Sequence, residues 1–290
     1  MKRFIGYYVL ESIIDPERST LDPQIFDNPN ESNPRIKPAI IQLIQSGINR
    51  IQEKTSVIDY TIIGSILTKR YSDTSDVDIN VLISSGDYNA VKDFAISISE
   101  KNIPSTKHPI NFHVVDNRKD FNNANESADA VFDPKQNKFI RKASSKPFDL
   151  NQYWSDYKTV VDTIKDAKED LKDDLIDYEQ LKTIKREDLQ AIKQKLETEI
   201  KEIEGDVHEL EGIYDKIKKE RRSAFEAPLT ATEIYKYGSK NRLPQNVIYK
   251  LLEKHYYLQF IQKIEEIIGP DNKLSKSETD KLSNYVLKQS

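Results

Sequence analysis

Two acidic residues, Asp76 and Asp78, stand two positions apart at the start of an apolar run and could bind a metal ion. Residues two apart on a β-strand point the same way, so both carboxylates would project together while Val77 and Ile79 face the opposite side. Neighbouring carboxylates repel one another unless a cation lies between them, and their oxygens suit a hard divalent ion. The spacing therefore predicts a site for Mg²⁺, or for Mn²⁺, at Asp76 and Asp78.

A glycine and a serine, Gly64 and Ser65, precede the acidic pair by ten intervening residues and could hold phosphate. The glycine lets the chain turn sharply where a side chain would block a phosphate group, and Ser65 with the amides behind it could hold phosphate oxygens. Ser75 stands directly before the acidic pair. Lys69 and Arg70 lie between the two halves of the motif, where they either reach a triphosphate or are ordinary exposed turn residues. A metal site beside a phosphate cradle indicates a nucleoside triphosphate site.

Alternating apolar and polar stretches indicate the elements that must position these residues. We expect a helix at 38–54, strands at 57–63, 77–83 and 109–115, a helix at 88–100, and a hairpin whose arms flank 133–137. The order helix, strand, strand, helix, strand predicts a mixed β-sheet with flanking helices, an α/β or α+β fold.

Gly64-Ser65, followed after ten residues by Asp76-Val77-Asp78, resembles the Gly-Ser…Asp-x-Asp signature of the DNA polymerase beta-like nucleotidyltransferase superfamily. The resemblance covers about residues 36–145. It implies transfer of a nucleoside monophosphate from a triphosphate to a hydroxyl of a nucleic-acid 3′ end or a protein, with release of pyrophosphate. It also implies two Mg²⁺ ions on the first two carboxylates, and a third carboxylate on a neighbouring strand.

Two further stretches resemble nucleotidyltransferase-like proteins of large tailed phages. They are His108-Pro109-Ile110-Asn111 and Asn241-Arg242-Leu243-Pro244. This second resemblance implies a phage-encoded protein that works in the host cytoplasm.

The third strand departs from the superfamily pattern, because its polar face carries Asn111 and His113 and neither is an acid. Asp116 is acidic, but it has the opposite parity and falls near the strand end. Three interpretations remain open. Asn111 is a weak metal ligand, or His113, with an unperturbed pKa of about 6.5, is a general base. In the third interpretation, the site binds nucleotide without turnover, and the protein is a nucleotide-binding or assembly module.

The chain divides by character into three parts. Residues 1–35 contain several prolines and predict an extended N-terminal arm, 36–148 form the expected nucleotidyltransferase domain, and 149–290 carry almost no strand signal. This last part predicts an all-helical domain, which includes one long helix at 244–268.

A seven-residue repeat of apolar residues marks the helical domain. Its members are Leu189, Leu196, Ile203, Leu210 and Ile217. A second apolar stripe lies at 157–184, so we expect a helical hairpin that packs on itself. The alternative is an intermolecular coiled coil, which would make the protein an oligomer through this hairpin.

Composition limits the classes of function. Lys and Arg number 44 against 48 Asp and Glu, so a net charge of −4 disfavours a nucleic-acid clamp formed by the whole protein. The absence of cysteine excludes disulfides and thiolate catalysis and fits a reducing cytoplasm. No stretch approaches the roughly 20 apolar residues of a membrane span, and the N-terminal run lacks the features of a signal peptide. We expect a cytoplasmic protein without a membrane partner.

Overall fold

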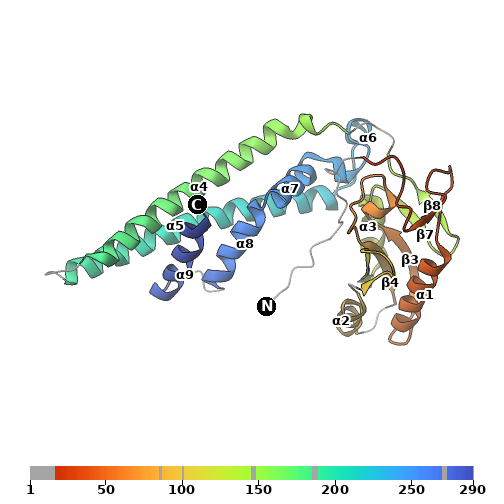
Figure 1. The fold of residues 1–290 in the computed structure, drawn as a ribbon, viewed down its shortest axis with the longest axis horizontal. Coiled ribbons are helices and arrows are strands. Elements are labelled where there is room, and N and C mark those ends of the chain that lie inside the picture. Colours follow the sequence, from red (N-terminus) through yellow and green to blue (C-terminus); the bar gives the residue numbers. More distant parts are fainter. Residues whose placement is uncertain are drawn as a thin grey trace. The chain divides into compact units, whose positions relative to one another are not determined.

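The structure is a computed structural model that describes residues 17–84, 87–99, 101–144, 148–184, 189–269 and 273–289 (Figure 1). The first sixteen residues of the predicted arm, with the question of a signal peptide, lie outside the described residues. The chain forms two compact units. One comprises the residues up to Phe148 together with Ala224–Val247, and the other comprises Asp149–Ser223 together with Ile248–Ser290.

A mixed six-stranded sheet forms the centre of the first unit, in the order β5-β6-β4-β3-β7-β8. The strands are β3 (Val57–Ile63), β4 (Val77–Ile83), β5 (Lys101–Asn102), β6 (Pro109–Val115), β7 (Val131–Asp133) and β8 (Lys138–Arg141). β4 and β6 are parallel, and the other neighbouring pairs are antiparallel. The predicted mixed sheet with flanking helices is confirmed, and β3, β4 and β6 have the predicted bounds.

The two faces of this sheet are covered by different helices (Figure 1). α1 (Pro38–Gln52) and α2 (Tyr88–Ile98) pack on the apolar face, where their buried side chains join Ile79 and Phe112 in the main core. α1 comes very close to the sheet at Gly47, where an added Cβ would lie 2.1 Å from Cζ of Phe112. α3 (Arg118–Ser127) contacts β4 and β6. Its Phe121 carbonyl accepts a hydrogen bond from Asn80, so α3 lies on the polar face.

The described part of the arm is more regular than the sequence indicated. β1 (Phe26–Asp27) pairs antiparallel with β2 (Arg35–Ile36). This short ladder forms because Phe26 and Ile36 are buried in the main core, and the Phe26 ring lies 6.0 Å from the ring of Phe139. The arm is therefore packed on the sheet.

The second unit is helical, as predicted, and α4 (Trp154–Thr183) and α5 (Leu189–Glu226) form its long hairpin (Figure 1). The buried residues of α4 recur at helical spacing: Tyr157, Val161, Ile164, Ala167, Leu171, Leu175 and Tyr178. The buried residues of α5 are Ile203, Val207, Leu210, Tyr214 and Ile217. The two helices meet at Asp174 and Asp206. Their buried side chains also contact the helices that follow, since Tyr178 of α4 donates to Asp280 and Tyr214 of α5 accepts from Gln262.

The predicted helix at 244–268 is two helices, α7 (Pro244–Lys254) and α8 (Tyr257–Ile268). The break occurs because Tyr256 has a φ of 65°, a left-handed conformation that ends the first helix and begins the second. α6 (Ala231–Lys236) belongs to the segment grouped with the first unit, and α9 (Lys276–Val286) packs against α4 and α8. Among the described helices, none combines the length and the hydropathy needed to cross a bilayer.

Candidate active site

The parallel pairing of β4 and β6 gathers four of the predicted site residues. Asp78 and Asn111 are direct neighbours in the register of the two strands. The Asn111 side-chain amide donates a 2.7 Å hydrogen bond to Oδ2 of Asp76. Nε2 of His113 lies 3.1 Å from Oδ1 of Asp78. The carboxylate directly before β4 and the carboxylate on β4 are therefore each paired with one polar side chain of β6.

The electrostatics of this cluster favour a bound cation. Burial, followed by the negative charge of Asp78, raises the pKa of Asp76 to about 6. Burial alone would lower the pKa of His113, but its hydrogen bond to Asp78 and the charges of both carboxylates outweigh burial and raise it. The two neighbouring carboxylates fit a divalent metal, because the metal would compensate the repulsion that raises the pKa of Asp76. Only 1% of Asp78 is exposed, whereas Asp76 and His113 remain partly exposed.

Two features of the structure require glycine at position 64. Its φ of 108° and ψ of 174° lie in a region that is essentially restricted to glycine. A Cβ at this position would also lie 2.9 Å from Oδ2 of Asp78. The sequence interpretation assigned the open side of Gly64 to phosphate, and in the structure the Asp78 carboxylate lies beside it. Gly64 thus allows the end of β3 and the acidic residue of β4 to approach closely.

The predicted phosphate-binding serines are bonded to one another. The Ser65 hydroxyl donates to Oγ of Ser75 over 2.9 Å, and both serines are buried. Oγ of Ser75 also accepts a hydrogen bond from the amide of Ser72. These bonds tie the beginning of the loop at 64–76 to its end, directly before the acidic pair. Phosphate binding by Ser65 and Ser75 stays a prediction.

The two basic residues of the loop have different surroundings. Lys69 is exposed, and its backbone carbonyl accepts a hydrogen bond from the amide of Arg18. The Arg70 side chain pairs with Glu17 at 3.2 Å and lies over the ring of Phe148. The structure therefore engages Arg70 in contacts within the first unit and leaves Lys69 at the surface.

The sequence interpretation missed a row of buried amides and hydroxyls beneath the acidic pair. Asn80 lies two residues after Asp78 on β4, is 1% exposed, and donates from its amide to Oδ1 of Asn125 in α3. The Thr61 hydroxyl donates to the same oxygen over 2.7 Å. The parity of Asn80 with the acids could have identified it. Asn125 belongs to a helix that the apolar pattern did not reveal.

Asp116, the other acidic candidate, lies after the end of β6, is exposed, and accepts a hydrogen bond from its neighbour Asn117. A separate acidic group, Asp174, Glu199 and Glu202, lies on the α4–α5 hairpin with ligand atoms within 4.8 Å of one another. Its members are partly or fully exposed, and exposed acidic groups are common without a metal.

Comparison with known proteins found no relative of this chain. No protein family, no curated protein and no solved structure matches the chain. The residues of the site and the strands that hold them are therefore the evidence for its function.

Proposed function

We propose that this chain is a metal-dependent nucleotidyltransferase. It would move a nucleoside monophosphate from a nucleoside triphosphate to a hydroxyl acceptor, a nucleic-acid 3′ end or a protein, and release pyrophosphate. The observation that carries the proposal is the pair of carboxylates at the start of β4, Asp76 directly before the strand and Asp78 on it, each hydrogen-bonded to a polar side chain of β6. The resemblance of the Gly-Ser and Asp-x-Asp pattern to the polymerase beta-like superfamily supports it.

Asp76 and Asp78 are the residues that would hold Mg²⁺ or Mn²⁺. The bound ion would supply positive charge to the triphosphate and acidify a coordinated hydroxyl. Asn111 fixes the orientation of Asp76, because its amide occupies Oδ2 of that carboxylate.

His113 is suited to accept the proton of the attacking hydroxyl. A carboxylate only accepts hydrogen bonds, so the contact with Asp78 places a hydrogen on Nε2 of His113. In the neutral imidazole, Nδ1 then carries the free lone pair. Asp78 also makes this ring more basic, since it raises the pKa of His113. The acceptor oxygen would bond to the α-phosphorus, the bond to the pyrophosphate oxygen would break, and the hydroxyl proton would pass to Nδ1.

Transfer of label from an α-labelled triphosphate tests the enzyme directly. The protein is incubated with each of the four labelled nucleotides, Mg²⁺, and a mixture of RNA, DNA and cell extract, and the labelled fraction is identified. Asp76→Asn and Asp78→Asn should abolish transfer. Asp116→Asn is the matched control, because it removes an exposed acid just beyond β6, and it should keep full transfer. Unchanged labelling by Asp76→Asn would refute the assignment.

A second candidate is a nucleotide-binding or assembly module without turnover. β6 favours this candidate, because the strand supplies Asn111 and His113 where the superfamily pattern has a carboxylate. Calorimetry with a non-hydrolysable triphosphate, with and without Mg²⁺, separates the two candidates. Metal-dependent binding without label transfer supports the inactive module. Absence of any metal-dependent binding contradicts both. Light scattering after size exclusion tests an assembly role through the hairpin.

A further inference from the structure

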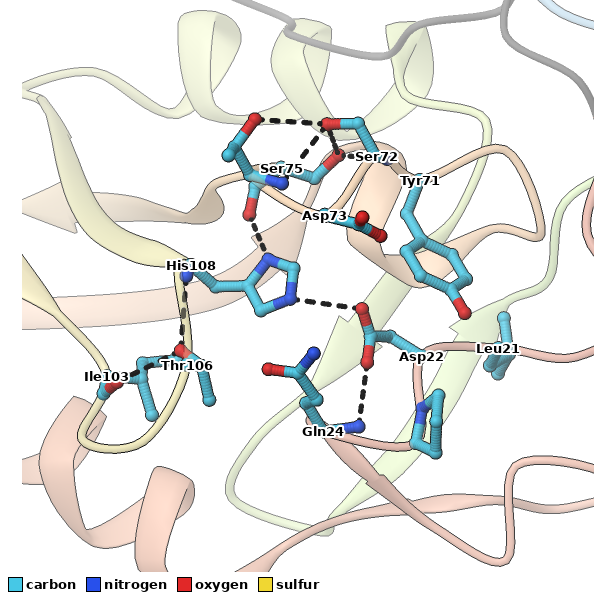
Figure 2. A network of polar contacts seen from close by, with 12 residues as sticks. Leu21, Asp22, Gln24, Tyr71, Ser72, Asp73, Ser75, Ile103, Thr106 and His108 are labelled. Atoms are coloured by element: carbon cyan, nitrogen blue, oxygen red, sulfur yellow. Dashed lines mark hydrogen bonds and ion pairs between the residues drawn. The ribbon is translucent and has the colours of Figure 1, made fainter.

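A histidine outside the proposed catalytic cluster is buried between two hydrogen-bond acceptors. The side chain of His108 has no exposed surface. Its Nδ1 lies 2.7 Å from the backbone carbonyl oxygen of Ser75, and its Nε2 lies 3.0 Å from Oδ2 of Asp22 (Figure 2). A carbonyl and an ionised carboxylate can only accept hydrogen bonds, while a neutral imidazole has a single N–H. The contact with Asp22 has the distance of an ion pair but not the geometry of a hydrogen bond. With Asp22 ionised, the imidazolium cation is the form of His108 that suits both neighbours.

The surroundings of Asp22 favour its ionised form beside this cation. Its side chain is 2% exposed, and its second oxygen, Oδ1, accepts a 2.7 Å hydrogen bond from the amide of Gln24. Burial acts to raise the pKa of Asp22, but the interaction with His108 and the hydrogen bond from Gln24 outweigh burial and lower it. Burial acts to lower the pKa of His108, but interactions led by the one with Asp22 outweigh burial and raise it. The 3.0 Å contact and these opposite shifts both favour a buried charged pair.

This pair connects the N-terminal arm to the loop that carries the proposed metal ligands. Asp22 belongs to the arm, and His108 stands directly before β6. The contact of His108 with the Ser75 carbonyl holds the residue that precedes Asp76. The Ser75 hydroxyl in turn accepts from Ser65 at the other end of the loop. Movement of the pair would be transmitted to Asp76 through one peptide unit.

The arm also holds the same loop at a second, exposed point. Arg18 donates from its backbone amide to the carbonyl of Lys69, from Nε to the carbonyl of Tyr71, and from its guanidinium to Asp73. The ion pair of Arg18 and Asp73 is largely solvated, with side chains 42% and 71% exposed, and such pairs contribute little. The buried contact of Asp22 and His108 is the stronger constraint, because removing one member leaves the other without its partner inside the protein.

We propose that Asp22 and His108 are positioning residues for the metal site, so that the N-terminal arm contributes to metal binding. The pair would fix the Ser75 carbonyl and thereby hold Asp76 beside Asp78 and Asn111. This inference rests on the proposed function, because the geometry it protects is that of the metal ligands.

A measurement on the unaltered protein tests the charged pair first. The protein contains four histidines, so the imidazole signals of His108 can be assigned by their loss in His108→Gln. At about pH 7, above the ordinary histidine pKa of about 6.5, both ring nitrogens of His108 should show the ¹⁵N shifts of protonated nitrogens. The acidic groups that act on this ring are Asp22 and Asp73. An unprotonated ring nitrogen would overturn the inference.

The positioning role is tested in the full chain with Asp22→Asn, and Asp27→Asn is the matched control because Asp27 is an exposed acid of the same arm. Mn²⁺ binding is measured by calorimetry, and amide exchange of residues 64–78 by mass spectrometry. Asp22→Asn should bind Mn²⁺ about 10- to 100-fold more weakly and exchange faster in this segment. Asp27→Asn should match the unaltered protein in both.

The other outcomes separate this inference from the proposed function. If the unaltered protein binds no Mn²⁺, the proposed function fails, and the positioning role fails with it. If the unaltered protein binds Mn²⁺ and Asp22→Asn binds it equally well, the positioning role is overturned and the proposed function stands. Faster exchange with unchanged Mn²⁺ affinity also overturns it, because the pair would then stabilise the loop without serving the site.

Discussion

Replacement of Gly64 by alanine should damage the fold and the site together. The backbone at Gly64, with φ of 108° and ψ of 174°, costs a residue with a side chain about 1–3 kcal/mol. The new Cβ would also lie 2.9 Å from Oδ2 of Asp78, and this carboxylate is buried and paired with His113. Displacement of the carboxylate adds a further cost, about 1 kcal/mol by analogy with overpacked cores. We expect a total loss of about 2–4 kcal/mol from the free energy of unfolding of the first unit.

Hydrogen exchange of peptides from β3 and β4 is the suitable assay, because the protein's single tryptophan, Trp154, lies in the second unit. A loss of this size corresponds to exchange about 30- to 700-fold faster, since each 1.4 kcal/mol is about a tenfold change. Gly205→Ala is the matched control. Gly205 is an exposed residue of α5 with no atom within 4 Å of an added Cβ, so this alanine should stabilise the second unit by about 0.5–1 kcal/mol.

A double-mutant cycle separates the two causes at Gly64. In the background Asp78→Ala the carboxylate is absent, so Gly64→Ala should retain only the cost of the backbone conformation. The coupling between the two substitutions should therefore be about 1 kcal/mol. A cost of Gly64→Ala below about 0.5 kcal/mol would refute the conformational argument, and strict additivity would refute the close approach to Asp78.

Three further substitutions test other parts of the fold. Gly47→Ala should destabilise the first unit by about 1–3 kcal/mol in a denaturant titration, despite better helix propensity, because the new methyl overlaps the Phe112 ring. Burial and the charge of Asp174 raise the pKa of Asp206 to about 7. The helical unit should therefore lose stability as the pH rises from about 4 to about 7, because the folded state must give up the proton of Asp206 in this range. Unfolding of Asp206→Asn, followed by Trp154 fluorescence, should show a flatter dependence of stability on pH. Tyr256→Gly should raise the melting temperature of the same unit by relieving a left-handed residue, and a fall would contradict this.

The strands that hold the site could be predicted from the sequence because their signals are local. β3, β4 and β6 are runs of β-branched and apolar residues, and each has its predicted bounds. α3 could not be predicted in the same way, since only Phe121 and Ser127 are buried in it and no apolar stripe marks a helix. A local signal did exist at its start, where the Asn117 side chain accepts from the amide of Asp120.

The contacts that complete the site were beyond sequence reasoning because they join distant segments. Nothing in the arm around Asp22 indicates that its carboxylate meets His108, since neither residue lies in a periodic pattern. The break between α7 and α8 was also hidden, because Tyr256 is not a residue that usually adopts a left-handed backbone. Periodicity identifies which face of an element is buried, and it does not identify the partner.

The chemistry of the polar face depends on packing of the opposite face. Asn111 and His113 meet the two carboxylates because β6 pairs with β4 in a single register, and a shift of one residue would place Ile110 and Phe112 beside the acids. The register is held by Ile110, Phe112 and Val114, which are buried in the core under α1 and α2. A substitution such as Phe112→Ala, which touches no proposed ligand, should therefore weaken Mn²⁺ binding in addition to reducing stability by about 3–5 kcal/mol. Unchanged Mn²⁺ affinity in a folded Phe112→Ala protein would show that the site does not depend on this register.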